Sequence, residues 1–387
     1  MMEKCLGIIS IGDGENNFGV LCKNRPSYML PFGGRYRLID FTISNMVNHG
    51  LRTVAVYTGE KIRSTMDHLG NGKPWDLNRR FKGLFLFPPV YDGNSGSHIG
   101  DLIQFYSTME FFNQAREEYV FINHPNIIAK VDLDKAFKHF INSGADITLI
   151  YKKQYDPTGE LINCDKIHLN KNGELLNLGL NLATEKKFNH FLGMGFVKKD
   201  VFLNIIKDSI EKGNARFFKE AMLIYKNKYK INTFEFEGHV ETIRDLKSFY
   251  DANLNLLNKD ISRELFFEGG AVFTKSKDEP STYYSESSNV QNSLIANGCI
   301  IEGNVENSII FRGAKIGKGA IVKNSVVMQK SEILEDAIVV NTILDKQTSI
   351  EEGVRIAGSA VMPYVVEKYQ KIRKDWSLWK YYMLLQK

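Results

Sequence analysis

A chain of 387 residues is long enough for about two domains, each with its own apolar core. Hydrophobic residues make up 43% of the chain and charged residues 25%, which is ordinary globular usage and excludes a disordered, collagen-like or coiled-coil protein. The net charge of +5 is small for this length and is not segregated, so nucleic acid is not an expected partner, whereas small anions remain compatible ligands.

The first 250 residues alternate short β-branched or aromatic runs with amphipathic stretches, the pattern of βαβ units around a mostly parallel sheet. We predict strands at 6–11, 53–57, 119–123 and 146–152. We predict helices at 37–48 and 133–142, each followed by a glycine stop at Gly50 or Gly144. This part of the chain therefore predicts a Rossmann-like α/β domain.

Residues 274–289 are polar and contain a proline, which marks a boundary between two kinds of sequence. Beyond it, aliphatic residues recur every six positions, at Ile310, Ile316, Val322, Met328, Leu334 and Val340. The phase slips near Lys346 and resumes at Ile350. Such a period fits neither a helix nor a flat sheet, and it is typical of hexapeptide repeats, whose short strands point aliphatic side chains into a narrow prism. We predict a parallel β-helix.

The segment PFGGRYRLIDF at 31–41, followed by Ser44-Asn45, resembles the signature of ADP-glucose pyrophosphorylases, the glucose-1-phosphate adenylyltransferases of glycogen synthesis. The ANL motif at 252–254 and the hexapeptide region resemble the same family in the same order. The resemblance implies a Rossmann-like nucleotidyltransferase domain followed by a left-handed parallel β-helix, assembled as a homo- or heterotetramer. The reaction that it implies converts ATP and glucose 1-phosphate to ADP-glucose and pyrophosphate.

On this basis the chain divides into four expected regions. They are a nucleotidyltransferase-like domain at 1–255, a linker at 256–289, a left-handed β-helix at 290–365 and a tail at 366–387. The tail is amphipathic at 376–385, and we expect it to pack on the β-helix or on a neighbouring subunit.

The resemblance places the family's two magnesium-binding aspartates where this chain has Pro125 and Thr242. Proline cannot ligate a metal, and magnesium requires hard oxygen ligands. We therefore expect no catalytic residue and no metal or other cofactor on this chain, with Mg²⁺ acting only in a catalytic partner subunit. Glu241 and Asn126 are the neighbouring residues that could serve as substitute ligands.

Other segments that the resemblance assigns to the substrates are altered too. The glycine-rich loop at 10–17 contains Asp13 and Glu15 and no arginine, although two like charges about 4 Å apart repel by roughly 4 kcal/mol at an effective dielectric near 20. The family's Lys-Pro pair, its Glu-Lys-Pro segment and its Arg-Gly-Thr segment correspond to Ser27-Tyr28, to 178–181 and to Ile99-Gly100-Asp101. We expect Asp101 itself to be solvated. Together the departures predict a chain that kept the fold and lost the chemistry.

Arg25 and Arg37 match family positions that bind anionic effectors. A guanidinium group suits phosphate or sulfate because it donates two parallel hydrogen bonds. The lysine beside the first arginine in such enzymes is Asn24 here, and Arg37 could instead pair with an acid such as Asp40. Binding of an anionic effector by Arg25 and Arg37 is therefore one hypothesis, and an ion pair between Arg37 and an acid such as Asp40 is the alternative.

The whole pattern resembles the D-type subunit that some bacteria make beside a catalytic ADP-glucose pyrophosphorylase subunit. We expect a regulatory or structural subunit that is inactive alone and modulates its partner. The alternatives are an active adenylyltransferase with substitute metal ligands and a non-enzymatic sugar-phosphate sensor. Four scattered cysteines without a CxxC, and the lack of an apolar run of about eighteen residues, predict a cytoplasmic protein without membrane contact.

Overall fold

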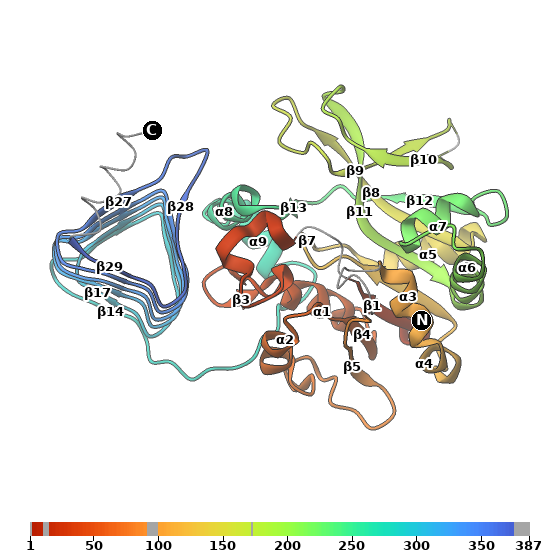
Figure 1. Cartoon of the computed structure of the whole chain (residues 1–387), viewed down its shortest axis with the longest axis horizontal. Coiled ribbons are helices and arrows are strands. Elements are labelled where there is room, and N and C mark those ends of the chain that lie inside the picture. Colours follow the sequence, from red (N-terminus) through yellow and green to blue (C-terminus); the bar gives the residue numbers. More distant parts are fainter. Residues whose placement is uncertain (1, 11–14, 91–99, 172, 375–387) are drawn as a thin grey trace. The chain divides into compact units, whose positions relative to one another are not determined.

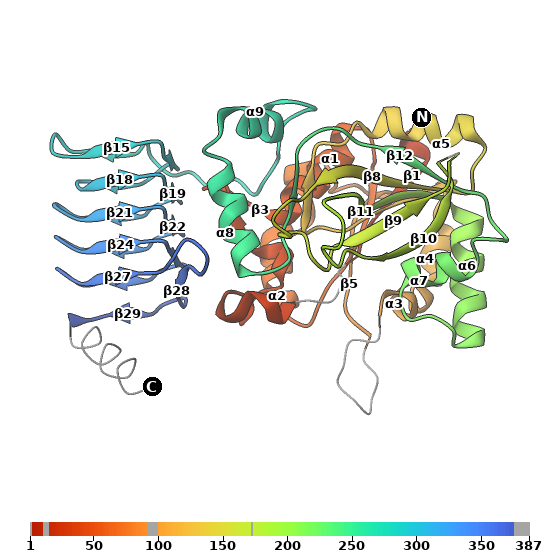
Figure 2. The ribbon, with the colours of Figure 1, turned by 90° about the horizontal axis from the view of Figure 1, so that it is seen from above.

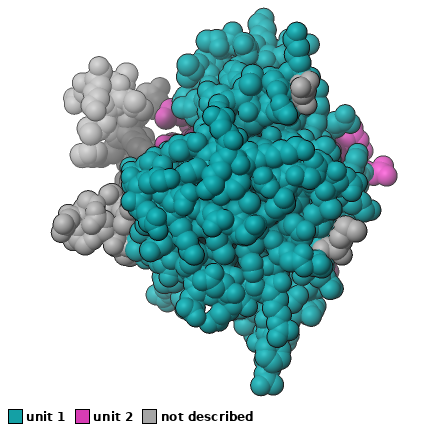
Figure 3. All heavy atoms as spheres, turned by 90° about the vertical axis from the view of Figure 1, so that its right-hand side faces the viewer, with its two compact units in different colours: residues 1–13, 39–240, 267–273 teal, residues 14–38, 241–266, 274–387 magenta. Residues whose placement is uncertain are grey.

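The computed structural model describes residues 2–10, 15–90, 100–171 and 173–374, and Figure 1 labels its elements. The chain forms two compact units, which Figure 3 colours teal and magenta. Unit 1 comprises residues 1–13, 39–240 and 267–273, and unit 2 comprises residues 14–38, 241–266 and 274–387. Segments 14–38 and 241–266 thus group with the C-terminal part of the chain, a grouping that the contiguous ranges predicted from the sequence do not express. Those ranges stay a prediction.

Unit 1 is built on a nine-stranded sheet with the order β10-β9-β11-β6-β1-β4-β5, in which β8 also pairs with β11, and β12 pairs with β8. Its strands are β1 Cys5–Ile9, β4 Thr53–Tyr57, β5 Gly83–Phe87, β6 Tyr119–Asn123, β8 Ile147–Tyr155, β9 Asp165–Leu169, β10 Leu175–Leu180, β11 Lys187–Lys198 and β12 Ile231–Glu235. The part around β1 is parallel, because β1 pairs in parallel with β4 and β6, and β4 with β5. This arrangement confirms the predicted α/β domain.

The helices of unit 1 cover this sheet and bury its apolar side chains. They are α1 Leu38–Asn48, α2 Ile62–Leu69, α3 Asp101–Ser107, α4 Met109–Gln114, α5 Leu133–Ser143, α6 Lys199–Lys212 and α7 Phe218–Ile224. The predicted helix at 133–142 is α5, which begins after Asp132 and ends at Gly144, a residue with the left-handed φ of 61° that glycine adopts without strain. The Asp132 side chain caps α5 by accepting a hydrogen bond from the Lys135 N–H.

Short elements complete the chain. They are the 3₁₀ helices η1 Met2–Lys4, η2 Glu15–Cys22, η3 Ser27–Met29 and η4 Lys73–Trp75, the strands β2 Pro31–Phe32, β3 Tyr36–Arg37, β7 Ile127–Ala129 and β13 Val240–Thr242, and the helices α8 Leu246–Asn255 and α9 Lys259–Phe267. Helix α9 therefore occupies the start of the predicted linker. In the described ranges, no helix is long and apolar enough to cross a membrane. The predicted packing of the tail at 376–385 lies outside the described residues.

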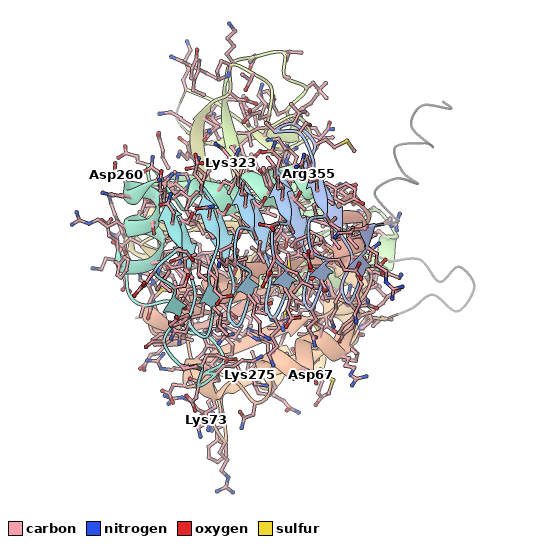
Figure 4. The ribbon with its side chains drawn as sticks, turned by 90° about the vertical axis from the view of Figure 1, so that its left-hand side faces the viewer. Asp67, Lys73, Asp260, Lys275, Lys323 and Arg355 are labelled. Atoms are coloured by element: carbon pink, nitrogen blue, oxygen red, sulfur yellow. The ribbon has the colours of Figure 1, made fainter. Side chains whose placement is uncertain are left out.

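The C-terminal part of unit 2 is the predicted β-helix, in which three parallel sheets wind around one core. Figure 1 shows its coils nearly end-on as a triangle, and Figure 2 shows them stacked. One sheet contains β14 Tyr283–Tyr284, β17 Ile300–Ile301, β20 Lys315–Ile316, β23 Glu332–Ile333, β26 Ser349–Ile350 and β29 Lys371–Ile372. The second contains β15 Asn289–Gln291, β18 Asn304–Glu306, β21 Ile321–Lys323, β24 Ile338–Val340 and β27 Arg355–Ala357, and Figure 4 labels Lys323 and Arg355 on it. The third contains β16 Leu294–Ile295, β19 Ile309–Ile310, β22 Val326–Val327, β25 Thr342–Leu344 and β28 Tyr364–Val366.

Up to Ser349 the coils are shorter than three hexapeptides, which corrects the predicted phase of the repeat, whereas the last coil takes 22 residues from Ser349 to Lys371. Glu332 pairs with Lys315 and with Ser349, so one coil takes 17 residues. Because one residue is missing from each such coil, the inward positions after Val322 are Val327 and Ile333. The strict six-residue phase had placed Leu334 inside, but its side chain is 41% exposed.

The shortened turn of each coil carries an Asn followed by Ser or Thr. Asn307, Asn324 and Asn341 adopt positive φ values of 46–47°, a conformation that asparagine tolerates. The next residue then forms a ladder, because the Ser325 N–H donates to Ser308 Oγ at 3.0 Å and the Thr342 N–H donates to Ser325 Oγ at 3.2 Å. The hydroxyl oxygens of this ladder thus give hydrogen-bond acceptors to backbone N–H groups of fully buried residues.

Replacing Ser325 by alanine is expected to lower the free energy of unfolding of unit 2 by about 1–3 kcal/mol, because the Thr342 N–H loses its acceptor in a buried place. The measurement is urea-dependent labelling of the buried Cys299 thiol, which reports on the coils themselves. Ser287→Ala, which removes an exposed hydroxyl, is the matched control. Equal labelling curves for the two variants would show that the ladder contributes nothing.

Candidate functional site

The carboxyl ends of β1 and β6 lie side by side in unit 1, the edge at which open α/β sheets bind ligands. Ile9 pairs with Asn123, and the Ser10 N–H donates to Asn123 O at 3.3 Å. Pro125 follows as a buried residue in the turn between β6 and β7. At this end of β6 the chain therefore presents a cyclic side chain with no ligand atom where the family resemblance expects a metal-binding carboxylate.

Asp101 lies at the same edge, and the structure corrects the expectation that it is solvated. The Phe218 N–H donates to one carboxylate oxygen at 2.7 Å, and Ser10 Oγ lies 3.4 Å from the other. Burial of the carboxyl raises its pKa to about 7 despite these hydrogen bonds. Asp101 thus adds a titrating acid at the edge where a nucleotide triphosphate would have to bind.

Gly100 fixes the position of Asp101 at the start of α3. Its φ is 94°, and a Cβ atom at this position would lie 2.2 Å from Arg216 O. Any other residue would collide with this backbone, so glycine is required for α3 to pack where it does. The glycine of the family's Arg-Gly-Thr segment is therefore kept, and the residue after it is an acid.

His124 and Lys219 are also unsuited to hold a phosphate at this edge. Burial lowers the pKa of His124 to about 4, so its imidazole is neutral at neutral pH, and its Nδ1 accepts a hydrogen bond from the Asn126 N–H at 3.3 Å. Lys219 Nζ lies 3.0 and 3.1 Å from the two carboxylate oxygens of Asp165. The edge thus carries a neutral histidine and an internally paired lysine.

The sugar-binding segment predicted at 178–181 is internally satisfied as well. Asn181 is 1% exposed, its Nδ2 donates to Leu161 O at 2.9 Å, and its Oδ1 accepts from the Ala183 N–H at 3.1 Å. The amide therefore closes a loop of unit 1 and has no charge to offer a sugar phosphate.

Thr242, the second position where the resemblance predicts a metal ligand, belongs to unit 2 at the end of β13. Its neighbour Glu241 is buried, and Glu241 Oε1 accepts a hydrogen bond from Asn255 Nδ2 of α8 at 3.0 Å. Pro125 and Thr242 supply no carboxylate, so the residues present do not fit a catalytic magnesium ion. No reaction step is assigned to such an ion on this chain.

The ANL motif has a clear role within unit 2. Asn253 is fully buried, its Oδ1 accepts a hydrogen bond from the Gly33 N–H at 3.2 Å, and its Nδ2 donates to Phe249 O at 2.9 Å. The motif therefore ties the FGG loop to α8, and the two segments that carried the family resemblance support one another.

A second group of candidate side chains lies in unit 2 and is called the basic cluster here. It consists of Arg25, Arg37, Lys277, Arg312 and Lys346. The electrostatic neighbours of Lys346 include Arg37 and Arg25, and those of Lys277 include Arg312 and Arg37. Arg37 is thus common to both groups. So many cations around one arginine favour a bound anion.

Arg25 has a buried carboxylate partner, Asp345, on the β-helix. Its Nη2 forms an ion pair with Asp345 Oδ2, and the two side chains are only 6% and 1% exposed. The Lys346 N–H donates to the other carboxylate oxygen at 2.7 Å. Asp345 therefore partly neutralises the cluster from within.

Lys346 is the member whose charge depends most on its surroundings. Burial, and then repulsion from Arg37 and Arg25, lowers the pKa of its amine to about 6. Arg37 Nη1 donates to Met29 O at 3.4 Å, while Asp40, the acid suggested as its alternative partner, lies 2.6 Å from His68 Nε2. Arg37 is therefore an electrostatic neighbour of Lys346, and Asp40 contacts His68.

Sequence reasoning found Arg25 and Arg37 but missed Asp345, Lys346 and Arg312. The signal was present, because the six-residue phase slips at Lys346. An Asp-Lys pair at the point where the aliphatic repeat changes phase indicates that this coil has a role beyond packing its own core.

Comparisons with known proteins agree with both units. Residues 12–159 match the family model described as nucleotidyl transferase, and residues 278–361 match the one described as GlmU-like, C-terminal hexapeptide. The glycogen biosynthesis protein GlgD of Bacillus subtilis (strain 168) is 33% identical over 95% of this chain and 96% of its own length. The protein of the same name from Geobacillus stearothermophilus is 34% identical over 83% of this chain and 84% of its own length. The glucose-1-phosphate adenylyltransferase of Geobacillus stearothermophilus is 29% identical over 84% of both chains.

Proposed function

The chain belongs to the ADP-glucose pyrophosphorylase family, among its GlgD-like members, and we propose that it is a regulatory or structural subunit of glycogen biosynthesis with no turnover of its own. The observation that carries the proposal is the pair Pro125 and Thr242 at the metal positions of an otherwise intact fold. Asp101, which titrates near neutrality, and Lys219, which is paired with Asp165, support it, because an acid and an already paired lysine are poor ligands for a triphosphate.

A subunit of this kind acts through contacts with a catalytic subunit in a mixed tetramer in the cytoplasm. Coupling between subunits is typically worth about 1–3 kcal/mol, which corresponds to roughly 5- to 150-fold in apparent affinity. The test compares the ATP and glucose 1-phosphate saturation curves of the cognate catalytic subunit with and without this chain, after sedimentation has established that the two associate. Identical curves for an associated mixture would leave only a structural role, and no association at all would favour the sensor hypothesis.

We propose that the basic cluster is the binding site of an anionic effector of this subunit. Arg37 and Lys346 are the residues we propose as direct ligands, because Arg37 is an electrostatic neighbour of both Lys346 and Lys277. An arginine fork and a neighbouring amine suit the oxygens of a phosphate or sulfate group.

Binding of an anion at this cluster is expected to weaken as the pH rises. The amine of Lys346 has a pKa of about 6 in the free chain, so it is mostly neutral at pH 8, and an anion favours its protonated form. Binding therefore takes up a proton, and the affinity for sulfate, which does not titrate in this range, should fall by up to about tenfold per pH unit above pH 6. Isothermal calorimetry at pH 6 and pH 8 measures this.

Two variants sharpen this measurement. Lys346→Met should abolish the pH dependence, and Arg37→Ala should weaken binding by about tenfold or more. Lys315→Ala is the matched control, because Lys315 pairs with Glu332 at the surface of the same coils. Binding that is unaffected by Lys346→Met and Arg37→Ala would place the anion elsewhere.

A further inference from the structure

Three metal-ligating side chains gather in unit 1, away from the carboxyl edge of the sheet. His49 follows α1, and Asp132 and Asp134 stand at the start of α5. The ligand atoms of the three side chains lie within 4.8 Å of one another. An imidazole nitrogen with two carboxylate oxygens is a donor set used by divalent zinc and its neighbours in the first transition row.

The ring of His49 is already oriented for such a role. Its Nδ1 lies 2.8 Å from Asn45 O, and because a carbonyl oxygen can only accept, Nδ1 carries the proton. A ring protonated at Nδ1 leaves Nε2, the nitrogen nearer to Asp132, as the atom that can ligate an ion. Metal-binding histidines are commonly fixed in this way, by a hydrogen bond from the other ring nitrogen to a backbone carbonyl.

The distance between His49 and Asp132 leaves room for an ion. Nε2 lies 3.9 Å from Asp132 Oδ1, which is too long for a hydrogen bond. Ligand distances of about 2.0–2.2 Å from a zinc ion to each atom would require these atoms to close by only a few tenths of an ångström. Oδ1 also accepts a hydrogen bond from the Lys135 N–H, and because a carboxylate oxygen has two lone pairs, one remains for the ion.

A buried oxygen beside the cluster points to the same kind of ligand. Asn45 lies one helical turn before His49, it is 2% exposed, and its Nδ2 donates to Val131 O next to Asp132. Among the described residues its Oδ1 has no hydrogen-bond partner. A buried amide oxygen without a hydrogen-bond donor is costly, so this side chain, one turn before His49 and bonded to the residue before Asp132, has an oxygen left for a further ligand such as a metal-bound water.

We propose that His49, Asp132 and Asp134 bind a divalent cation of the zinc type, which joins the end of α1 to the start of α5. The exposed side of the cluster leaves the remaining coordination positions to water, since the Asp132 side chain is 64% exposed and that of His49 only 12%. The ion would neutralise two adjacent carboxylates and would hold the two segments together. Its role is structural and separate from the magnesium of the family reaction.

The test uses the full, untagged chain, freed of metal with a chelator and titrated calorimetrically with ZnCl₂ and, in parallel, with CaCl₂. We expect saturable binding of one Zn²⁺ with a rise in melting temperature, and no comparable binding of Ca²⁺, which prefers sites built only from oxygen ligands. His49→Gln and Asp134→Asn should each weaken Zn²⁺ binding about tenfold or more.

His168→Gln is the matched control, because His168 is an exposed histidine of the same unit that lies on β9. It should bind Zn²⁺ as the unaltered chain does. The proposal is overturned if the unaltered chain shows no saturable Zn²⁺ binding, if Asp134→Asn binds as tightly as the unaltered chain, or if His168→Gln loses as much affinity as His49→Gln. Asp134 is exposed, so its variant folds even if the His49 variant does not.

Discussion

Replacing Asp345 by asparagine is expected to lower the free energy of unfolding of unit 2 by about 3–5 kcal/mol, because it leaves the buried Arg25 guanidinium without its counter-charge. Arg37 and Arg25 are both electrostatic neighbours of Lys346, so a second arginine opposes the uncompensated charge. Urea-dependent labelling of Cys299 reports unfolding of unit 2, and labelling of Cys5, which is buried in β1, reports unit 1. Only the Cys299 curve should move.

Two comparisons make this result specific. Lys315→Ala breaks a surface pair on the same coils, Lys315 with Glu332, and should cost less than about 1 kcal/mol. Sulfate should restore much of the stability of Asp345→Asn, because a bound anion replaces the missing carboxylate. Unfolding curves of Asp345→Asn that match those of the unaltered chain would mean that the Arg25 ion pair is not stabilising.

Replacing Asp101 by asparagine is expected to stabilise unit 1 at pH 8 and to have little effect near pH 4. The pKa of Asp101 is about 7 in the folded chain against 3.8 for an unperturbed aspartate. Between these values the folded state binds the proton and the unfolded state does not, so the stability of the unaltered chain falls as the pH rises. At about 1.4 kcal/mol per pKa unit, the loss reaches at most about 4 kcal/mol above pH 7.

Asparagine avoids this loss because it carries no charge, while its Oδ1 still accepts from the Phe218 N–H. The free energy of unfolding from Cys5 labelling at pH 5, 6, 7 and 8 measures the difference. Glu110→Gln, which neutralises an exposed acid on α4, is the control and should change stability by only a few tenths of a kcal/mol. If the difference between Asp101→Asn and the unaltered chain does not grow with pH, Asp101 is as solvated as the sequence suggested.

The sequence predicted the parts of the fold that depend on local pattern. The alternating runs located β4, β6, α1 and α5 because apolar periodicity and glycine stops act within a dozen residues. The hexapeptide period predicted the β-helix but not its phase, because the missing residue in each coil is compensated by the turn at Asn324 and its equivalents, where a positive φ shortens the path. Leu334 was therefore placed on the wrong side.

The candidate site could be predicted only where a family motif carried it. Pro125 and Thr242 are visible as substitutions, and Arg25 and Arg37 as matches. The partner of Arg25 is 320 residues away in the chain, and no periodicity links the two. Asp101 was misjudged for the same reason, since its environment is made by the Phe218 N–H, which only the folded chain brings to it.

The claim that the chain kept the fold and lost the chemistry is tested most directly by its own rate of ADP-glucose formation from ATP and glucose 1-phosphate with Mg²⁺. Two samples are assayed, the chain alone and the chain mixed with a cognate catalytic subunit whose metal-binding aspartates have been replaced. Neither sample should form ADP-glucose, whereas the intact catalytic subunit is active and changes its substrate saturation when this chain is added. Metal-dependent turnover by either inactive sample would contradict the account, because Pro125 and Thr242 would then not have abolished the chemistry of this chain.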